Sequence, residues 1–251
     1  MRYACQIDYN GSAFSGWQRQ NNAITVQAEI EAAISILTSV DSQVTGCGRT
    51  DTGVHAANYV FHVDIDTIED FTDPIWIHKL NQLLPIGIAF RKIVAVDPEY
   101  HSRYDAISRQ YRYRLVTKKP VFGHDHITYY KYESSLNVDK LNEVAEMFLD
   151  ATDFTAFSKL HGGNKTSICD ITVCKWEQLD DEYHLLIKAN RFLRGMVRLT
   201  VGSHLNYHRN KLTKQDIHQA LFNQVPLPIV WSVESNGLSL ESITYPSQLF
   251  D

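Results

Sequence analysis

The chain lacks the features of secreted, membrane-spanning and low-complexity proteins. It has only four cysteines, and no two of them form a C-x-x-C pair, so the sequence predicts neither a disulfide framework nor a structural zinc site. No stretch approaches the roughly 20 apolar residues that a membrane span needs, and the first residues contain no apolar run typical of a signal peptide. We therefore expect a cytoplasmic, folded protein with no membrane partner, whose thiols are reduced and buried.

Metal-binding motifs are also scarce. The pairs His124/His126 and His204/His208 have metal-like spacing, but neither has a third ligand nearby of the H-E-x-x-H kind. No metal site is expected.

An excess of positive charge is lacking too, because 24 Lys and Arg residues stand against 29 Asp and Glu residues and leave a net charge of −5. This balance argues against a general polyanion binder, which needs a positive surface to displace counterions. The basic residues are unevenly distributed, however. Residues 101–119 contain six of them and one acid, and residues 186–214 contain seven and no acid. The segregation predicts a positive groove on an otherwise acidic protein.

Hydrophobic periodicity predicts two comparable halves that each contain strands and helices. Strands are expected at residues 3–9, 43–47, 58–63, 88–96, 110–117, 171–179, 183–188 and 238–243. Helices are expected at 26–37 behind a Thr25 cap, at 141–149, at 193–200, and after a capping box that begins at Thr213. We therefore expect an α/β (α+β) fold of two lobes around a cleft, residues 1–100 and 101–251, with a boundary loop near Pro98.

Residues 46–56 (Gly-Cys-Gly-Arg-Thr-Asp-Thr-Gly-Val-His-Ala) form the segment richest in possible chemistry. A predicted strand runs into a turn with glycines on both sides of Arg49-Thr50-Asp51, which projects a carboxylate and lets a ligand approach closely. Arg49 is placed to keep Asp51 ionised. An ordinary polar turn in which Asp51 caps backbone N–H groups explains these residues equally well. The Asp-Thr-Gly triplet also matches aspartic proteases, but these need a second such segment, and the chain has no second copy.

Aromatic and cationic side chains alternate on the strand predicted at residues 110–117. Tyr111 and Tyr113 share one face of it, and Arg112 and Arg114 share the other. This arrangement suits base stacking combined with phosphate contact. A half-buried strand with core tyrosines and solvated arginines explains it as well.

A cationic face is predicted on the helix near residues 188–200. Arg191, Arg194 and Arg198 follow one another at i, i+3 and i+7, opposite an apolar stripe. They either grip RNA or form a solvated basic face. Near the start of the chain, Trp17 lies in a polar loop and either contacts RNA or belongs to the core.

Taken in order, these segments resemble the tRNA pseudouridine synthase A family over nearly the whole chain. The motifs that carry the resemblance lie at residues 9–11, 16–20, 48–56, 101–103, 111–113, 153–157, 196–198, 201–202, 237–238 and 245–246. Several motifs in one order are far more specific than any one of them. The chain departs from the family at Ser108-Arg109-Gln110, which is less basic than in many members, and at Leu193-Arg194-Gly195, where some members carry histidines.

The resemblance implies a pseudouridine synthase fold, with an antiparallel or mixed sheet and helices on one face in each lobe, a central positively charged cleft, and usually a homodimer. It implies the isomerisation of uridine to pseudouridine at positions 38, 39 or 40 in the anticodon stem-loop of tRNA, without a cofactor. By matching positions, Asp51 is the nucleophile, Tyr111 lies against the target base, and Arg49 and Arg198 flank the aspartate. The other expected substrate contacts are Trp17, Gln18, Arg19, His55, Arg103, Arg112, Arg191 and Arg194.

Pseudouridine formation is within reach of these residue types. The reaction breaks the N1–C1′ bond, rotates the uracil and rejoins it through C5, so it needs a nucleophile and a closed pocket. A buried carboxylate loses its charge unless a cation compensates, and Arg49 or Arg198 would provide that cation. The alternative function is a non-catalytic RNA-binding protein or tRNA chaperone, whose sequence would retain the aromatic and basic residues but lose Asp51.

Overall fold

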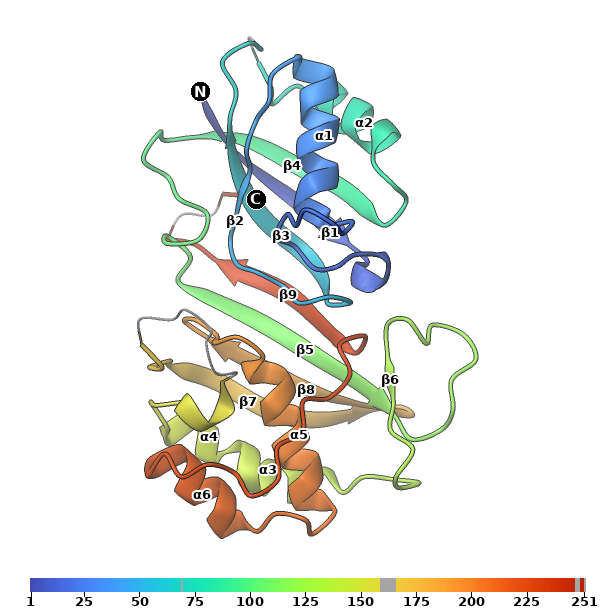
Figure 1. Cartoon of the computed structure of the whole chain (residues 1–251), viewed down its shortest axis with the longest axis vertical. Helices are drawn as coiled ribbons and strands as arrows, with labels where there is room; N and C mark the ends of the chain where they lie inside the picture. Colours follow the sequence, from blue (N-terminus) through green and yellow to red (C-terminus); the bar gives the residue numbers. More distant parts are fainter. Residues whose placement is uncertain (69, 159–165, 247–248, 251) are drawn as a thin grey trace. The chain divides into compact units, whose positions relative to one another are not determined.

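The computed structural model describes residues 1–68, 70–158, 166–246 and 249–250 (Figure 1). The chain divides into two compact units. Unit 1 comprises Met1–Ile107 and Ser239–Asp251, and unit 2 comprises Ser108–Leu238. The boundary expected from the sequence differs from this division because nothing local in residues 239–246 indicates that this segment returns to the first half of the chain.

Unit 1 is built on a mixed sheet. Its elements are β1 (Arg2–Tyr9), a 3-10 turn (Gly11–Ala13), α1 (Val26–Thr38), β2 (Thr45–Gly46), β3 (His55–Asp64), α2 (Pro74–Leu83), β4 (Ile88–Val96) and β9 (Leu238–Thr244). The strand order is β4-β1-β3-β9, with β2 also paired to β3. All of these pairs are antiparallel except β3 with β9, which run parallel. The expected mixed sheet is therefore confirmed in this unit.

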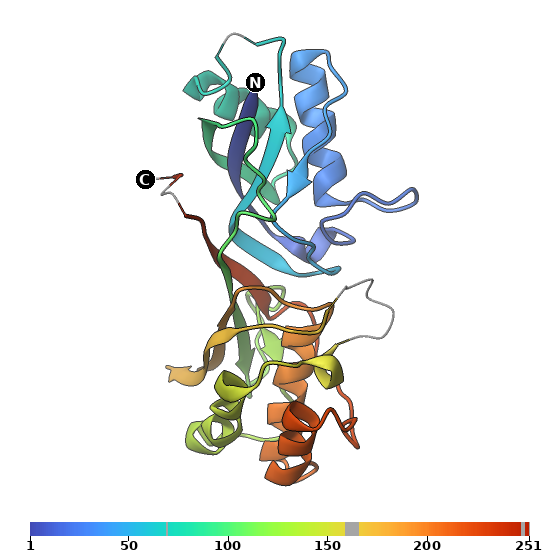
Figure 2. The same ribbon diagram turned by 90° about the vertical axis from the view of Figure 1, so that its left-hand side faces the viewer.

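The core of unit 1 is assembled around its central strand, β1. Cys5 of β1 is opposite Phe61 of β3 and Ile93 of β4, and all three side chains are buried. Helix α1 begins as predicted, because the Thr25 side chain accepts a hydrogen bond from Ala28 N at 3.4 Å. Figure 2 shows α1 on one side of these strands. Burial of this apolar core gives the loops of unit 1 a rigid support.

Unit 2 contains a second group of strands and most of the helices. Its elements are β5 (Ser108–Val116), β6 (Thr128–Tyr129), α3 (Val138–Ala145), α4 (Met147–Asp150), a 3-10 turn (Thr155–Phe157), β7 (Ile171–Leu179), β8 (Glu182–Ala189), α5 (Met196–His208) and α6 (Lys214–Phe222). Strands β5, β8 and β7 form an antiparallel ladder in that order, and β6 runs parallel to the end of β5. Helices α3 and α4 pack on β7, and α3 also packs on α5.

Helix α5 differs from its predicted form. The periodicity predicted a helix from residue 193, but α5 begins at Met196 because Gly195 has φ 73°, a left-handed conformation that interrupts the chain. Arg191 and Arg194 therefore precede the helix, and the predicted cationic face with Arg198 was wrong. Nearly every position from Met196 to Asn206 is buried, which makes α5 the central helix of unit 2.

Candidate active site

Asp51 lies in the loop between β2 and β3 of unit 1 and is partly exposed. The chain turns directly after it, because Val54 N donates a hydrogen bond to the Asp51 carbonyl oxygen at 3.1 Å. Gly53, inside this turn, has φ 78°, which a residue with a side chain rarely adopts. The glycine that follows Asp51-Thr52 is therefore required by the backbone. The turn predicted from the sequence is confirmed.

The segment 14–17 holds the backbone of this loop. Trp17 N donates to the Thr50 carbonyl at 3.2 Å, and Gly53 N donates to the Phe14 carbonyl at 3.3 Å. Between these contacts, Gly16 has φ 90°, and a Cβ at this position would lie 2.6 Å from the Thr50 carbonyl oxygen. A side chain would push the loop away. The sequence showed Gly16 only as part of a motif, and its contact with the Asp51 loop is a finding of the structure.

Trp17 and His55 are packed inside unit 1. The Trp17 ring is 2% exposed and stacks on Tyr59 with ring centroids 4.2 Å apart. The Tyr59 hydroxyl in turn donates to the Gly48 carbonyl of the Asp51 loop. His55 is buried at the start of β3, and its Nδ1 accepts a hydrogen bond from Gly11 N at 3.1 Å. Both residues were expected to bind substrate, and both are buried in unit 1.

Arg49 and Gln18 belong to a polar network that connects the loop to α1. The Arg49 Nε donates to Gln18 Oε1 at 3.0 Å, and Gln18 Nε2 donates to Gln27 Oε1 at 2.8 Å. Gln27 Nε2 continues the chain to Glu31 Oε1 at 2.9 Å. Glu31 is buried, and its second oxygen forms a 2.6 Å ion pair with Arg19. This network fixes the direction of Arg49, which itself is exposed.

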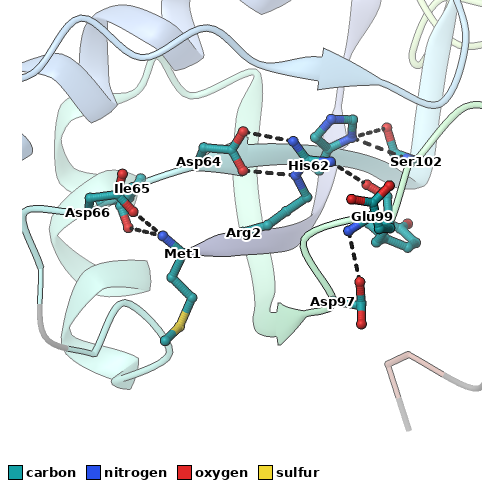
Figure 3. Close-up of polar contacts among 10 residues, drawn as sticks. Met1, Arg2, His62, Asp64, Ile65, Asp66, Asp97, Glu99 and Ser102 are labelled. Carbon is teal, nitrogen blue, oxygen red and sulfur yellow. Dashed lines mark hydrogen bonds and ion pairs between the residues drawn. The ribbon is translucent and has the colours of Figure 1, made fainter.

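The polar cluster in Figure 3 anchors residues 97–105 to the sheet of unit 1. Arg2 forms two 2.8 Å hydrogen bonds with the Asp64 carboxylate and donates a third to the Tyr100 carbonyl. His62 Nδ1 accepts a hydrogen bond from Ser102 N at 3.1 Å, and Ser102 Oγ donates to the Thr45 carbonyl at 2.6 Å. Burial and, to a smaller extent, Arg2 lower the pKa of His62 to about 4. The segment that carries Arg103 is therefore fixed beside β2.

Tyr111 and Arg198 belong to unit 2. Tyr111 lies on β5 opposite Ile187, is partly exposed, and packs edge-on against Phe192 with ring centroids 5.1 Å apart. Arg198 lies in the first turn of α5, and its Nε donates to the Val233 carbonyl at 2.7 Å. Asp51 and Arg49 belong to unit 1, so the expected catalytic set takes two residues from each unit.

Arg112 lies in an ion-pair network on β5. It forms a 2.8 Å ion pair with Glu177 of β7 and donates to His184 Nδ1 of β8 at 3.1 Å. Arg114 pairs with Glu182 in the same way, at 2.9 Å. The arginines on this face of β5 are thus matched by acids on β8 and β7. Among the other expected contacts, Arg194 is exposed.

No group of three or more His, Cys, Asp or Glu side chains in the described part of the chain could hold a metal ion. His204 is buried and accepts a 2.9 Å hydrogen bond from Trp176 Nε1. His208 contacts Glu133 at 2.7 Å. Within the described residues, the structure has no helix that is long and apolar enough to cross a membrane. All four cysteines are free and buried, as predicted.

Comparison with known proteins identifies the family. Residues 144–246 match the sequence model of a family described as tRNA pseudouridine synthase. Over its full length the chain is similar to several proteins named tRNA pseudouridine synthase A. It is 42% identical to the one from Parabacteroides distasonis over 250 residues, which cover 99% of this chain and 98% of the relative. It is 38% identical to that of Bacteroides fragilis, with 100% and 98% covered, and 38% identical to that of Porphyromonas gingivalis, with 99% of each covered.

The chain belongs to the tRNA pseudouridine synthase A family, whose members are isomerases. The family and the enzyme class expected from the sequence are both confirmed.

Proposed function

We propose that this protein isomerises uridine to pseudouridine in the anticodon stem-loop of tRNA, at positions 38, 39 or 40, with Asp51 as the nucleophile. The observation that most supports Asp51 as the nucleophile is the fixed backbone of its loop. The carboxylate is partly exposed, whereas the backbone on both sides of it is held by Gly16 and by hydrogen bonds from Trp17 and Val54. A nucleophile needs such a fixed position, because misplacement by about 1 Å costs on the order of 10²-fold in rate.

The reaction proposed for Asp51 conserves every atom of the substrate. Attack by the carboxylate gives a covalent intermediate, and the N1–C1′ bond breaks. The uracil rotates and forms a bond from C5 to C1′, the proton on C5 moves to the ring nitrogen N1, and the carboxylate leaves unchanged. The two sides of the reaction balance without an oxidant or reductant.

Tyr111, Arg49 and Arg198 are proposed as the groups that support this step. The partly exposed ring of Tyr111 is backed by Phe192, so it offers a fixed surface on which a uracil can stack. Base stacking on an aromatic side chain is worth about 1–3 kcal/mol, which offsets part of the cost of unstacking the uridine. Arg49 and Arg198 remain charged when water is excluded and compensate the negative charge of Asp51.

Some of the expected RNA contacts are exposed and others are buried. Gln18, Arg49, Arg103 and Arg194 reach the surface of their units and are proposed to touch RNA. Trp17 and His55, which are buried, are proposed to support the Asp51 loop. A homodimer and a cytoplasmic location stay predictions, and light scattering after size-exclusion chromatography tests the former.

Replacement of the nucleophile tests the proposal directly. We expect Asp51→Asn to abolish pseudouridine formation on unmodified tRNA, mapped by carbodiimide chemistry, and to leave tRNA affinity within a few-fold, because the amide keeps the size of the side chain. Asp41→Asn, an exposed residue of the same unit, is the matched control and should retain full activity. Appreciable turnover by Asp51→Asn refutes the nucleophile assignment. Tight tRNA binding without any pseudouridine in the wild type would favour the non-catalytic binder.

A further inference from the structure

A polar cavity of about 280 Å³ opens in unit 1 next to the Asp51 loop. The side chains that matter for its chemistry come from the start of the chain, from the segment around β2, and from residues 101–104. They are Gln18, Gln43, Arg49, His101, Arg103 and Tyr104. Asp51 is not part of its lining, whereas Arg49, two residues earlier in the same loop, is.

Tyr104 forms one wall of this cavity and has an unusual environment for an aromatic residue. Its side chain is 75% exposed. The His101 ring lies against it with centroids 4.3 Å apart, and the Arg103 guanidinium lies 5.7 Å from its centre. The ring is thus held by its neighbours although most of it faces solvent. A fixed, exposed aromatic ring beside a guanidinium is a surface on which a nucleic-acid base can stack.

The turn that carries Tyr104 is held by hydrogen bonds to the His101 ring and by contacts of Ser102. His101 Nδ1 accepts hydrogen bonds from Arg103 N at 3.1 Å and Tyr104 N at 3.3 Å. Ser102, between His101 and Arg103, is held by His62, as Figure 3 shows, and by its hydrogen bond to the Thr45 carbonyl of β2. The Tyr104 ring and its turn are therefore already ordered before a ligand binds, which lowers the entropic cost of binding.

The remaining groups of the cavity suit a nucleotide. Arg49 and Arg103 supply positive charge for a phosphate. Because the His101 Nδ1 accepts, the proton of its neutral ring lies on Nε2, which is a donor. Gln43 is exposed, with no hydrogen-bond partner for its amide in the described part of the chain, and offers both a donor and an acceptor to a base edge. Stacking surface, cation and amide together are the groups that recognise single-stranded RNA.

We propose that this cavity binds a second nucleotide of the RNA substrate, one or two positions from the target uridine, with its base on Tyr104 and its phosphate between Arg49 and Arg103. The proposal rests on the function proposed above. Arg49 precedes Asp51 by two residues, so their Cα atoms lie within about 7.6 Å. A nucleotide held at Arg49 would therefore be a near neighbour, along the RNA chain, of the uridine at Asp51.

Substitution of Tyr104 tests the stacking. We expect Tyr104→Leu to weaken binding of an unmodified anticodon stem-loop RNA by roughly 5-fold to 150-fold, and Tyr104→Phe to bind like the wild type. Tyr132→Leu is the matched control, because Tyr132 is also exposed beside a cation, Arg209, but lies in unit 2 far along the sequence. Equal affinities for the Leu and Phe variants at Tyr104 would overturn the proposal.

Ultraviolet cross-linking of the wild-type protein to the same RNA identifies the nucleotide that lies against Tyr104. The peptide that contains Tyr104 should carry a nucleotide one or two positions from the pseudouridine, and attachment to a distant nucleotide overturns the proposal. Binding of free uridine monophosphate that depends on Tyr104, without any effect on RNA affinity, also overturns it. The outcome is independent of Asp51→Asn, which tests turnover, so failure of this inference and failure of the proposed function are distinguishable.

Discussion

Acidification from pH 7 to pH 5 should destabilise this protein through His204. The imidazole is fully buried in unit 2, and its Nδ1 accepts a hydrogen bond from Trp176. Its Nε2 has no hydrogen-bond partner in the described part of the chain. Burial penalises the charged ring and lowers the pKa of His204 to about 3, from an ordinary value of 6.5.

The sign and size of the effect follow from proton binding. Below pH 6.5 the unfolded chain takes up a proton at His204, whereas the native protein does not until the pH approaches 3. The unfolded state therefore binds more protons in this window, and stability falls as the pH falls. Integrated from pH 7 to pH 5, the loss is about 2 kcal/mol of the free energy of unfolding. His62, whose pKa is lowered to about 4, should contribute a similar loss.

Urea unfolding followed by tryptophan fluorescence at the two pH values measures this loss. His204→Asn removes the titrating ring, while the Asn Oδ1 can still accept from Trp176. The variant should be less stable at pH 7 because it leaves a cavity, but its loss between pH 7 and pH 5 should be smaller than that of the wild type by about 2 kcal/mol. His78→Asn, at an exposed site on α2, is the control and should behave like the wild type. Equal losses for the wild type and His204→Asn would refute the reasoning.

Two further predictions concern the site. Gly16→Ala should reduce turnover at least tenfold by displacing the Asp51 loop. Gly123 also has a positive φ, 66°, but a Cβ there would meet no atom within 4 Å, so Gly123→Ala should affect stability alone, by about 1–2 kcal/mol. Equal turnover of the two variants in a single-turnover assay would contradict this. Arg194→Glu should weaken tRNA binding and reduce its dependence on salt concentration, because a phosphate contact is lost. A filter-binding titration at several salt concentrations that matches the wild type would exclude Arg194 from the RNA surface.

Local signals in the sequence predicted the regular elements well. The strands at residues 88–96 and 171–179 were predicted with the bounds that the structure gives to β4 and β7. The capping box at the start of α6 is also present, with reciprocal hydrogen bonds between Thr213 and Asp216. Helix α2 was missed although Trp76, Leu80 and Leu83 recur at helical spacing; of these residues only Leu80 is buried.

The surroundings of the candidate site were predicted less completely. The turn at Asp51 follows from glycines within a few residues of it, and local sequence is enough to find it. The burial of Trp17 depends on the packing of Tyr59 from β3, a contact between segments that periodicity does not report. Tyr104 was overlooked because a single aromatic residue in a loop has no pattern, although the neighbouring Arg103 and His101 could have drawn attention to it.

The return of β9 to unit 1 has a consequence for biosynthesis. His55 and Ala56, directly after the Asp51 loop, pair with Ser239 and Leu240 of β9. At about 5–20 residues per second, a ribosome needs roughly 10–40 s to make the chain between these partners. During that time the start of β3, at His55 and Ala56, lacks its β9 partner and is a site for wrong pairing. The strand that leads out of the Asp51 loop is thus paired completely only after residue 240 has been made, so a growing chain does not acquire the mature enzyme's full strand pairing before then.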